Sequence, residues 1–221
     1  MSHPSHTNLV IQKLYKELAD SGWNIDNTWF FTNVKSGTYN EVLPILVKYI
    51  PLIDDTNAKD GLIRSVSIKG YKDAVSILLS EYKKTHLSSL MWSIGNALRI
   101  IKDKTIVVEL IELLEKKTIY NDLPLKVSFE VKNPEVIAKE NLLPALGATK
   151  DLRALPVLRE YIKKPEFAVF ALEGLKFFKN RKELLPDLLK DAELLLDNPM
   201  PFVQKAAARF IKFLKEVHSN H

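Results

Sequence analysis

The fold of this chain is decided by the stretch Ala145-Leu146-Gly147-Ala148-Thr149-Lys150-Asp151-Leu152-Arg153-Ala154-Leu155-Pro156-Val157-Leu158. One apolar segment ends in it, a short Lys150-Asp151 turn follows, and a second apolar segment begins. An Asp or Asn side chain at such a turn accepts hydrogen bonds from the free N–H groups of the next helix. The turn recurs with spacings of 30, 48 and 29 residues between its acidic or amide positions, at Lys72-Asp73, Lys102-Asp103, Lys150-Asp151 and Lys179-Asn180. This repetition predicts one helical hairpin in about 30 residues.

The segments on both sides of these turns have the apolar spacing of helices, with apolar residues at i, i+3 or i+4, and i+7. Three of the segments carry Leu-Pro-x-Leu near their start, where a proline is tolerated because its missing N–H has no partner. The expected helices span residues 7–19, 41–50, 58–69, 74–84, 87–101, 105–117, 134–148, 152–164, 165–179, 181–196 and 201–217. A strand-like alternation occurs at residues 125–132, over a shorter length than any helix pattern. We therefore expect an all-α chain.

The stretch at residues 145–158 resembles the hinge between the two helices of a HEAT repeat, and most of all the short HEAT-like repeats also found in bilin lyases. Residues 171–180, 68–73 and 96–103 resemble the same hinge. The resemblance covers residues 40–217 and implies a right-handed α-α superhelix, a HEAT-like solenoid of about five helical hairpins. The sequence departs from the regular repeat pattern at two points, which are the Asn at position 180 and the 48-residue spacing.

The long spacing leaves an insertion at residues 118–133 between repeat regions at residues 40–117 and 134–217. Residues 1–39 form an N-terminal cap region, and we expect residues 1–221 to make a single α-solenoid domain. Within the cap region, the aromatic segment at residues 23–31 is expected to cover the open end of the stack; the alternative is an exposed anchor for a partner. Trp92 is expected to fill space beside a close helix contact at Gly95, with pocket lining as the alternative.

The composition limits the available chemistry. The chain has 221 residues, no cysteine, 7 glycines, and 32 Lys and Arg against 27 Asp and Glu, a formal net charge of +5. Without cysteine there is no disulfide scaffold, thiolate zinc site, iron–sulfur cluster or cysteine nucleophile. Four of the five histidines lie near the termini, and no catalytic triad or carboxylate pair is favoured. We expect no metal, no cofactor and no membrane span, lean towards a protein that is not an enzyme, and expect a cytoplasmic location.

In the resembling family, the second helix of each pair lies on the concave side of the superhelix. The exposed charges of those helices are mixed in sign, which fits either a groove for a protein segment of complementary polarity or an ordinary solvated face. We therefore hypothesise a non-enzymatic protein–protein interaction module, an adaptor or an inhibitory, immunity-type partner that binds through its concave face. The candidate partner-binding residues are Glu109, Glu112, Lys116, Arg159, Lys163 and Lys190.

The second hypothesis is a nucleic-acid-binding enzyme of the HEAT-like alkylpurine DNA glycosylase type, which is similar in length and repeats. None of that family's catalytic residues is carried over to this sequence. A basic stripe near the C-terminus offers phosphate contacts, or is the solvated face of the last helices, with no aromatic side chain clearly interleaved. Its residues are Lys179, Arg181, Lys182, Lys205, Arg209 and Lys212. A third hypothesis, handling of a pigment protein, follows from the repeat resemblance alone.

Overall fold

The computed structural model describes residues 6–117, 125–127, 130–132 and 134–219. In this part of the chain, α-helices follow one another and one two-stranded hairpin interrupts them, so the all-α prediction is confirmed. The helices are α1 (His6–Asp20), α2 (Leu43–Tyr49), α3 (Thr56–Ser65), α4 (Val75–Lys84), α5 (Ser88–Ile101), α6 (Val107–Glu115), α7 (Pro134–Lys139), α8 (Leu142–Ala148), α9 (Ala154–Ile162), α10 (Pro165–Leu175), α11 (Leu185–Glu193) and α12 (Pro201–Ser219). The strands are β1 (Leu125–Val127) and β2 (Glu130–Lys132).

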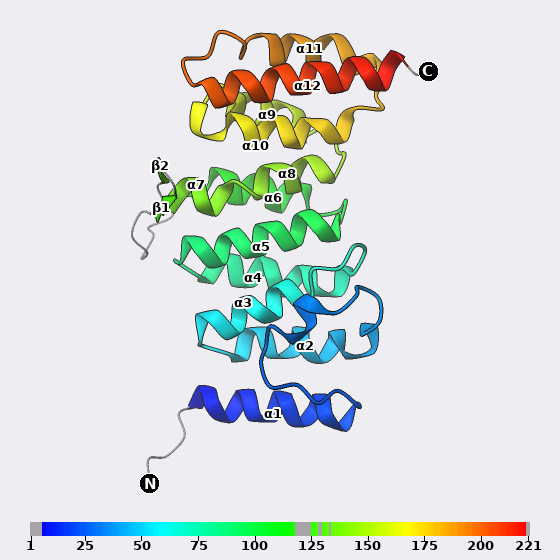
Figure 1. Ribbon diagram of the computed structural model, residues 1–221, viewed down its shortest axis with the longest axis vertical. Helices are drawn as coiled ribbons and strands as arrows, with labels where there is room; N and C mark the ends of the chain where they lie inside the picture. The colour runs from blue at the N-terminus through cyan, green and yellow to red at the C-terminus, as the bar shows by residue number, and fades with distance from the viewer. Residues whose placement is uncertain (1–5, 118–124, 128–129, 133, 220–221) are drawn as a thin grey trace.

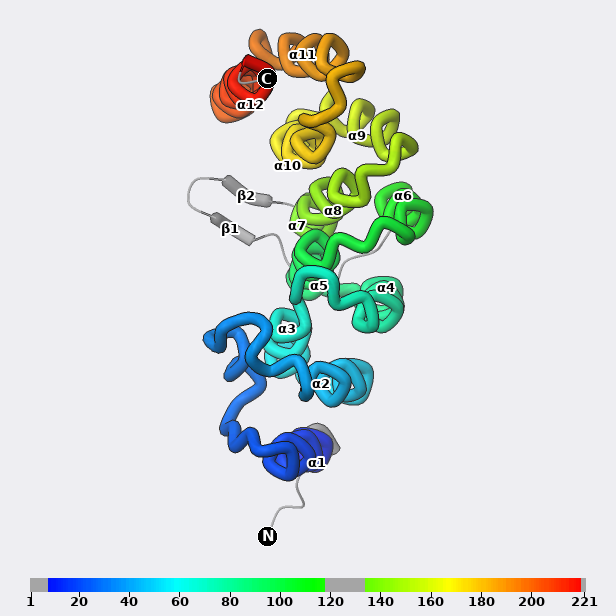
Figure 2. The backbone as a smooth tube through the Cα atoms, turned by 90° about the vertical axis from the view of Figure 1, so that its right-hand side faces the viewer, coloured from blue at the N-terminus to red at the C-terminus, as the bar shows by residue number. Residues whose placement is uncertain are grey.

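The helices are stacked along the long axis of the molecule, with α1 at one end and α11 and α12 at the other (Figure 1). Figure 2 shows two layers, one of α2, α4, α6, α9 and α11, and one of α3, α5, α7, α8, α10 and α12. The stack bends so that the second of these lies on the inner side, and we call the two the outer layer and the inner layer. One continuous apolar core, from Leu14 to Leu214, joins the layers along the stack.

Two glycines explain how closely the inner-layer helices approach. A Cβ atom added to Gly147 on α8 would overlap the backbone carbonyl of Gly174 on α10, and one added to Gly174 would lie 2.7 Å from the carbonyl oxygen of Leu143. Likewise, a Cβ on Gly95 would lie 3.1 Å from the Cβ of Asn141, which confirms the expected close helix contact there. Because these contacts shorten the inner layer, they favour a bend towards it.

The turn residues do not cap the following helices as predicted, since α6 and α9 both begin without a side-chain cap; two of them bond N–H groups inside their own turns. Asp103 Oδ1 accepts from the Thr105 backbone N–H at 3.0 Å, and Asp151 Oδ1 accepts from the Arg153 N–H at 2.9 Å. Residues 72–74 instead form a 3₁₀ turn without a side-chain cap. Asp55 caps α3 by accepting from the Ala58 N–H at 2.7 Å, a cap that the repeated turns did not indicate.

The helix expected at residues 134–148 is divided into α7 and α8, which the periodicity did not predict. Pro144 is the physical reason, because it has no N–H to donate to the carbonyl of Glu140 four residues earlier. The Ala145 N–H then bonds the Asn141 carbonyl at 3.1 Å and the second helix continues. The break turns Glu140 and Asn141 towards α5, where both side chains bond Trp92.

The structure describes two strands of the insertion and all of the N-terminal aromatic segment. β1 pairs with β2 in antiparallel register, with Val127 opposite Glu130, while residues 118–124, 128–129 and 133 lie outside the described residues. In the aromatic segment, Phe31 is 1% exposed and its ring centroid lies 5.2 Å from that of Trp23. These rings pack against the core beside α3, whereas α1 lies at the end of the stack (Figure 1), so the segment does not cover the open end as expected. Trp29 has a different environment, described below.

Candidate binding site

The six residues predicted to bind a protein partner belong to the outer layer. The structure places on or directly after α6, α9 and α11 the residues Glu109, Glu112, Lys116, Arg159, Lys163 and Lys190. The expectation that these helices line the concave side is therefore wrong, since they lie on the outer side of the bend (Figure 2). The close approach of α8 and α10 at Gly147 and Gly174 lies in the inner layer of this bend.

Some of these charges are also paired within the molecule. Arg159 donates from Nε to Asp191 at 2.7 Å and from Nη2 to Asp187 at 3.1 Å, which ties α9 to α11. Burial lowers the pKa of Arg159, but the two carboxylates outweigh it and the net shift is upward. Lys163 pairs with Glu160 at 2.7 Å. Two of the six predicted residues, Arg159 and Lys163, thus have ion pairs within the molecule.

The six residues of the predicted C-terminal basic stripe lie in different environments. Lys179 lines a large hollow on the inner layer, described next, whereas Lys182 lines a separate hollow of 420 Å³ beside His218. Arg181 lies 3.4 Å from Glu183, and Lys212 lies 3.7 Å from Glu216. The two remaining members, Lys205 and Arg209, are exposed on α12. Of the six, only Lys179 is brought together with other cations in that large hollow.

That hollow, with a volume of 650 Å³, lies where the C-terminal ends of α5, α8 and α10 meet along one edge of the stack (Figure 1). We call it the basic groove. Six cationic side chains and one carboxylate, Glu173, line it, so its surplus of five positive charges equals the formal net charge of the chain. Among the described residues, only Arg99 of the six has a carboxylate in ion-pair range, Glu173 at 3.7 Å. The cations are Lys69, Arg99, Lys102, Lys150, Lys176 and Lys179.

Two of these lysines have a backbone conformation that favours glycine. Lys102 and Lys150 have φ angles of 60° and 58°, and they are the described non-glycine residues with positive φ. A left-handed residue with a side chain costs about 1–2 kcal/mol that glycine would avoid. Part of this cost is offset because a cation at a helix C-terminus interacts favourably with the helix dipole, by about 0.3–1 kcal/mol. Both strained positions line the same groove.

The sequence contained a signal for this groove in the lysine of each repeated turn. Lys102, Lys150 and Lys179 each directly precede the acidic or amide residue that marks the repeat. Equivalent positions of stacked repeats become neighbours in space, so their charges gather although they are far apart in the sequence. Lys72, in the first turn, instead lies 3.6 Å from Asp103, and Lys69 lines the groove in its place.

Aromatic rings lie among these cations. The Lys102 ammonium is 5.3 Å from the ring centroid of Phe177, and the Lys179 ammonium is 5.2 Å from that of Phe213. Both rings are half-buried and line the groove. The expectation that no aromatic side chain is interleaved with the basic residues is therefore wrong, because the rings come from two helical segments that stacking brings together.

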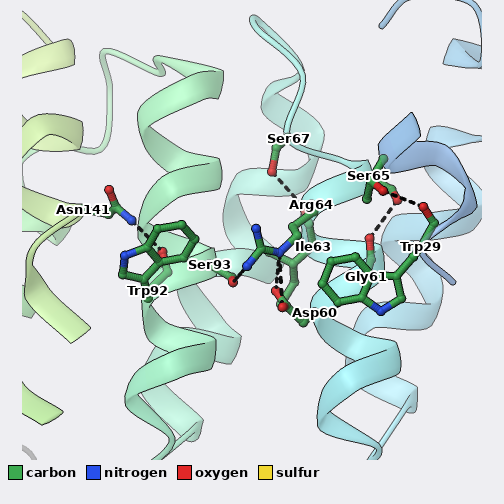
Figure 3. Close-up of polar contacts among 11 residues, drawn as sticks. Trp29, Asp60, Gly61, Ile63, Arg64, Ser65, Ser67, Trp92, Ser93 and Asn141 are labelled. Carbon is green, nitrogen blue, oxygen red and sulfur yellow. Dashed lines mark hydrogen bonds and ion pairs between the residues drawn. The ribbon is translucent and has the colours of Figure 1, made fainter. Parts of the chain in front are cut away.

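A second cation–aromatic cluster lies further along the inner layer. The Arg64 guanidinium on α3 lies 5.3 Å from the ring centroid of Trp29 and 5.2 Å from that of Trp92 (Figure 3). Asp60 accepts from Arg64 Nε at 3.1 and 3.2 Å, and Ser93 accepts from Nη2 at 3.1 Å. These contacts hold Arg64 between the two indoles. Trp92 is thus half-buried, and its ring contacts Arg64 as well as lying on the helix that carries Gly95.

Three further properties concern metal binding, membrane-spanning helices and similarity to known proteins. In that part of the chain, no group of three or more His, Asp or Glu side chains could hold a metal ion. None of its helices is long and apolar enough to cross a membrane. Comparisons with family models, curated proteins and solved structures find no match to this chain.

Proposed function

We propose that this protein is a non-enzymatic binding module, a short HEAT-like solenoid with a right-handed superhelical stack, that holds an anionic macromolecule in its basic groove. The stacked helices, their continuous core and the hinge-like turns support this architecture. An adaptor or inhibitory role remains the kind of activity that such a module performs. The proposed binding surface, however, moves from the outer-layer residues to the inner-layer groove.

The observation that carries the proposal is the pair of lysines at positive φ. Glycine at positions 102 and 150 would relieve backbone strain of about 1 kcal/mol each, yet the chain has lysine at both. Both side chains add to a groove with six cations and one carboxylate. Strained residues are typical of functional sites, and unpaired cations lining one hollow attract an anionic partner by long-range electrostatics.

The alkylpurine DNA glycosylase hypothesis also requires a basic groove, but we propose no catalytic step. The carboxylate that lines the groove is Glu173, and it lies 3.7 Å from Arg99. That pairing gives Glu173 an electrostatic role beside the cations. The groove therefore supports the binding part of this hypothesis and assigns no residue to catalysis.

Binding of labelled polyanions tests the proposal. Fluorescence anisotropy at about 50 mM salt, where phosphate-type contacts are strong, would use oligo(dT) and poly-L-glutamate as probes. We expect at least one probe to bind and the double variant Lys102→Gly/Lys150→Gly to weaken it about tenfold or more. The control Lys83→Ala/Lys190→Ala removes the same charge from exposed outer-layer positions and should bind like the wild type. Failure of both probes to bind would refute the proposal.

A further inference from the structure

The inner layer carries a series of cations in contact with aromatic rings. Starting from α12, the contacts are Lys179 on Phe213, Lys102 on Phe177, and Arg64 between Trp92 and Trp29. The first two belong to the basic groove. The third is joined to the groove through α5, because Trp92, Asn96 and Arg99 share one helix face.

That helix face sets the distance between the two clusters. Trp92 and Arg99 are seven residues apart, which is about 10 Å along a helix, and Asn96 lies between them. Arg99 Nη2 donates to Asn96 Oδ1 at 2.9 Å, and all three side chains are partly exposed. This face of α5 thus connects the groove with the Arg64 cluster (Figure 3), and we call the two together the inner-layer track.

We propose that the inner-layer track binds single-stranded nucleic acid, with phosphates on the lysines of the basic groove and bases stacked on Phe177 and Phe213. This inference rests on the proposed function, because it names the partner of the same groove. Single strands are bound by a basic channel combined with aromatic stacking platforms, and the track supplies both. Arg64, held by Asp60 and Ser93, adds a fixed cation at the far end.

Stacking is strong enough to displace the lysines that now lie on the rings. A cation on an exposed ring contributes about 2- to 5-fold in an equilibrium constant, whereas a stacked base contributes about 5- to 150-fold in affinity. A base can therefore take the place of the Lys102 or Lys179 ammonium on its ring. The displaced ammonium then stays close enough to pair with the phosphate of the same nucleotide.

The rings also distinguish this partner from the other polyanions. An acidic polypeptide pairs with the six cations but makes no stacking contact with Phe177 or Phe213. In a duplex, the base faces are stacked on one another and are not offered to the rings. Because half-buried aromatic side chains accompany two of the cations in the groove, the observations favour a single strand.

The test compares oligo(dT) of about 20 nucleotides, a duplex of equal length and poly-L-glutamate, using the full chain. The variant Phe177→Leu/Phe213→Leu keeps apolar side chains in the half-buried positions. We expect it to weaken oligo(dT) binding about 10-fold or more and to leave poly-L-glutamate binding unchanged. The control Phe202→Leu changes a 43% exposed phenylalanine on the same helix as Phe213 and should have no effect. Thermal unfolding of each variant checks that the fold is intact.

Four results would overturn the inference. If poly-L-glutamate binds and oligo(dT) does not, the partner is an acidic polypeptide and the proposed function survives. If the duplex binds at least as tightly as oligo(dT), or if the leucine variant binds oligo(dT) like the wild type while remaining folded, stacking is not used. If no probe binds at about 50 mM salt, the proposed function fails as well.

Discussion

Replacing Lys102 and Lys150 by glycine, and in parallel by alanine, separates the role of their charge from the role of their backbone. Both substitutions remove the ammonium from the groove. Only glycine relieves the strain of φ angles of 60° and 58°, because alanine still carries a Cβ atom. The two double variants thus differ in stability but share the same loss of charge.

The expected stabilities follow from three contributions. Relief of the left-handed conformation raises the free energy of unfolding by about 1–2 kcal/mol at each position. The greater freedom of glycine in the unfolded chain lowers it by about 0.4–1 kcal/mol. Loss of the charge at the helix C-terminus costs about 0.3–1 kcal/mol in either variant. The glycine variant should therefore unfold within about 1 kcal/mol of the wild type, and the alanine variant about 1 kcal/mol per site more easily than the glycine variant.

Urea unfolding followed by circular dichroism measures these differences, and anisotropy with labelled oligo(dT) and poly-L-glutamate measures binding. We expect the glycine and alanine variants to bind equally poorly despite their different stabilities. A glycine variant destabilised by more than about 2 kcal/mol would show that the lysines are required by the fold. A glycine variant that binds like the wild type would show that the strain at Lys102 and Lys150 has no function in binding.

Three further substitutions and one control test the packing, the turns and the ion pairs of the stack. Gly147→Ala should cost more than about 3 kcal/mol in urea unfolding because its Cβ overlaps the α10 backbone, whereas Gly37→Ala, at φ 94° in open space, should cost about 1 kcal/mol. Burial raises the pKa of Asp103, but hydrogen bonds from Thr105 and the charge of Lys72 lower it below its ordinary 3.8. The resulting stabilisation is complete above that pH and is lost as pH falls through the lowered pKa, so Asp103→Asn should cost about 1 kcal/mol at pH 7 and nothing in strong acid. Arg159→Met should cost about 1 kcal/mol at low salt and less at high salt.

Each of these predictions has a result that contradicts it. Equal stabilities of Gly147→Ala and Gly37→Ala would show that α8 and α10 do not approach as closely as the structure has them. A constant stability difference between wild type and Asp103→Asn across the acid range would show that the carboxylate charge is not the stabilising group. A salt-independent effect of Arg159→Met would assign the loss to packing.

Much of the fold was predictable because its determinants are local in the sequence. The spacing of apolar residues and the Lys-Asp turns placed the helices to within a few residues, including α12, whose apolar positions Val203, Ala207, Phe210 and Leu214 are all buried. The division of residues 134–148 was missed although Pro144 is visible in the sequence. In several other helices, such as α2 and α11, a proline near the start marks the beginning of the helix, and only the preceding residues show that Pro144 interrupts one.

The binding site was less predictable because it is made by stacking. Lys102, Lys150 and Lys179 belong to three repeats, and Phe177 and Phe213 to two helical segments, so no window of the sequence contains the groove. Which layer lies on the inner side of the bend is likewise set by the stacking of helices that are distant in the sequence. The predicted row from Glu109 to Lys190 therefore lies on the outer layer and not on the inner side of the bend.

The salt dependence of oligo(dT) binding tests the central claim most directly. In a plot of log affinity against log salt concentration, each lysine that contacts a phosphate contributes about one unit of slope. We expect the slope of Lys102→Gly/Lys150→Gly to be about two units shallower than that of the wild type, and the slope of Lys83→Ala/Lys190→Ala to be unchanged. Equal slopes for all three proteins would contradict the assignment of the basic groove as the binding site.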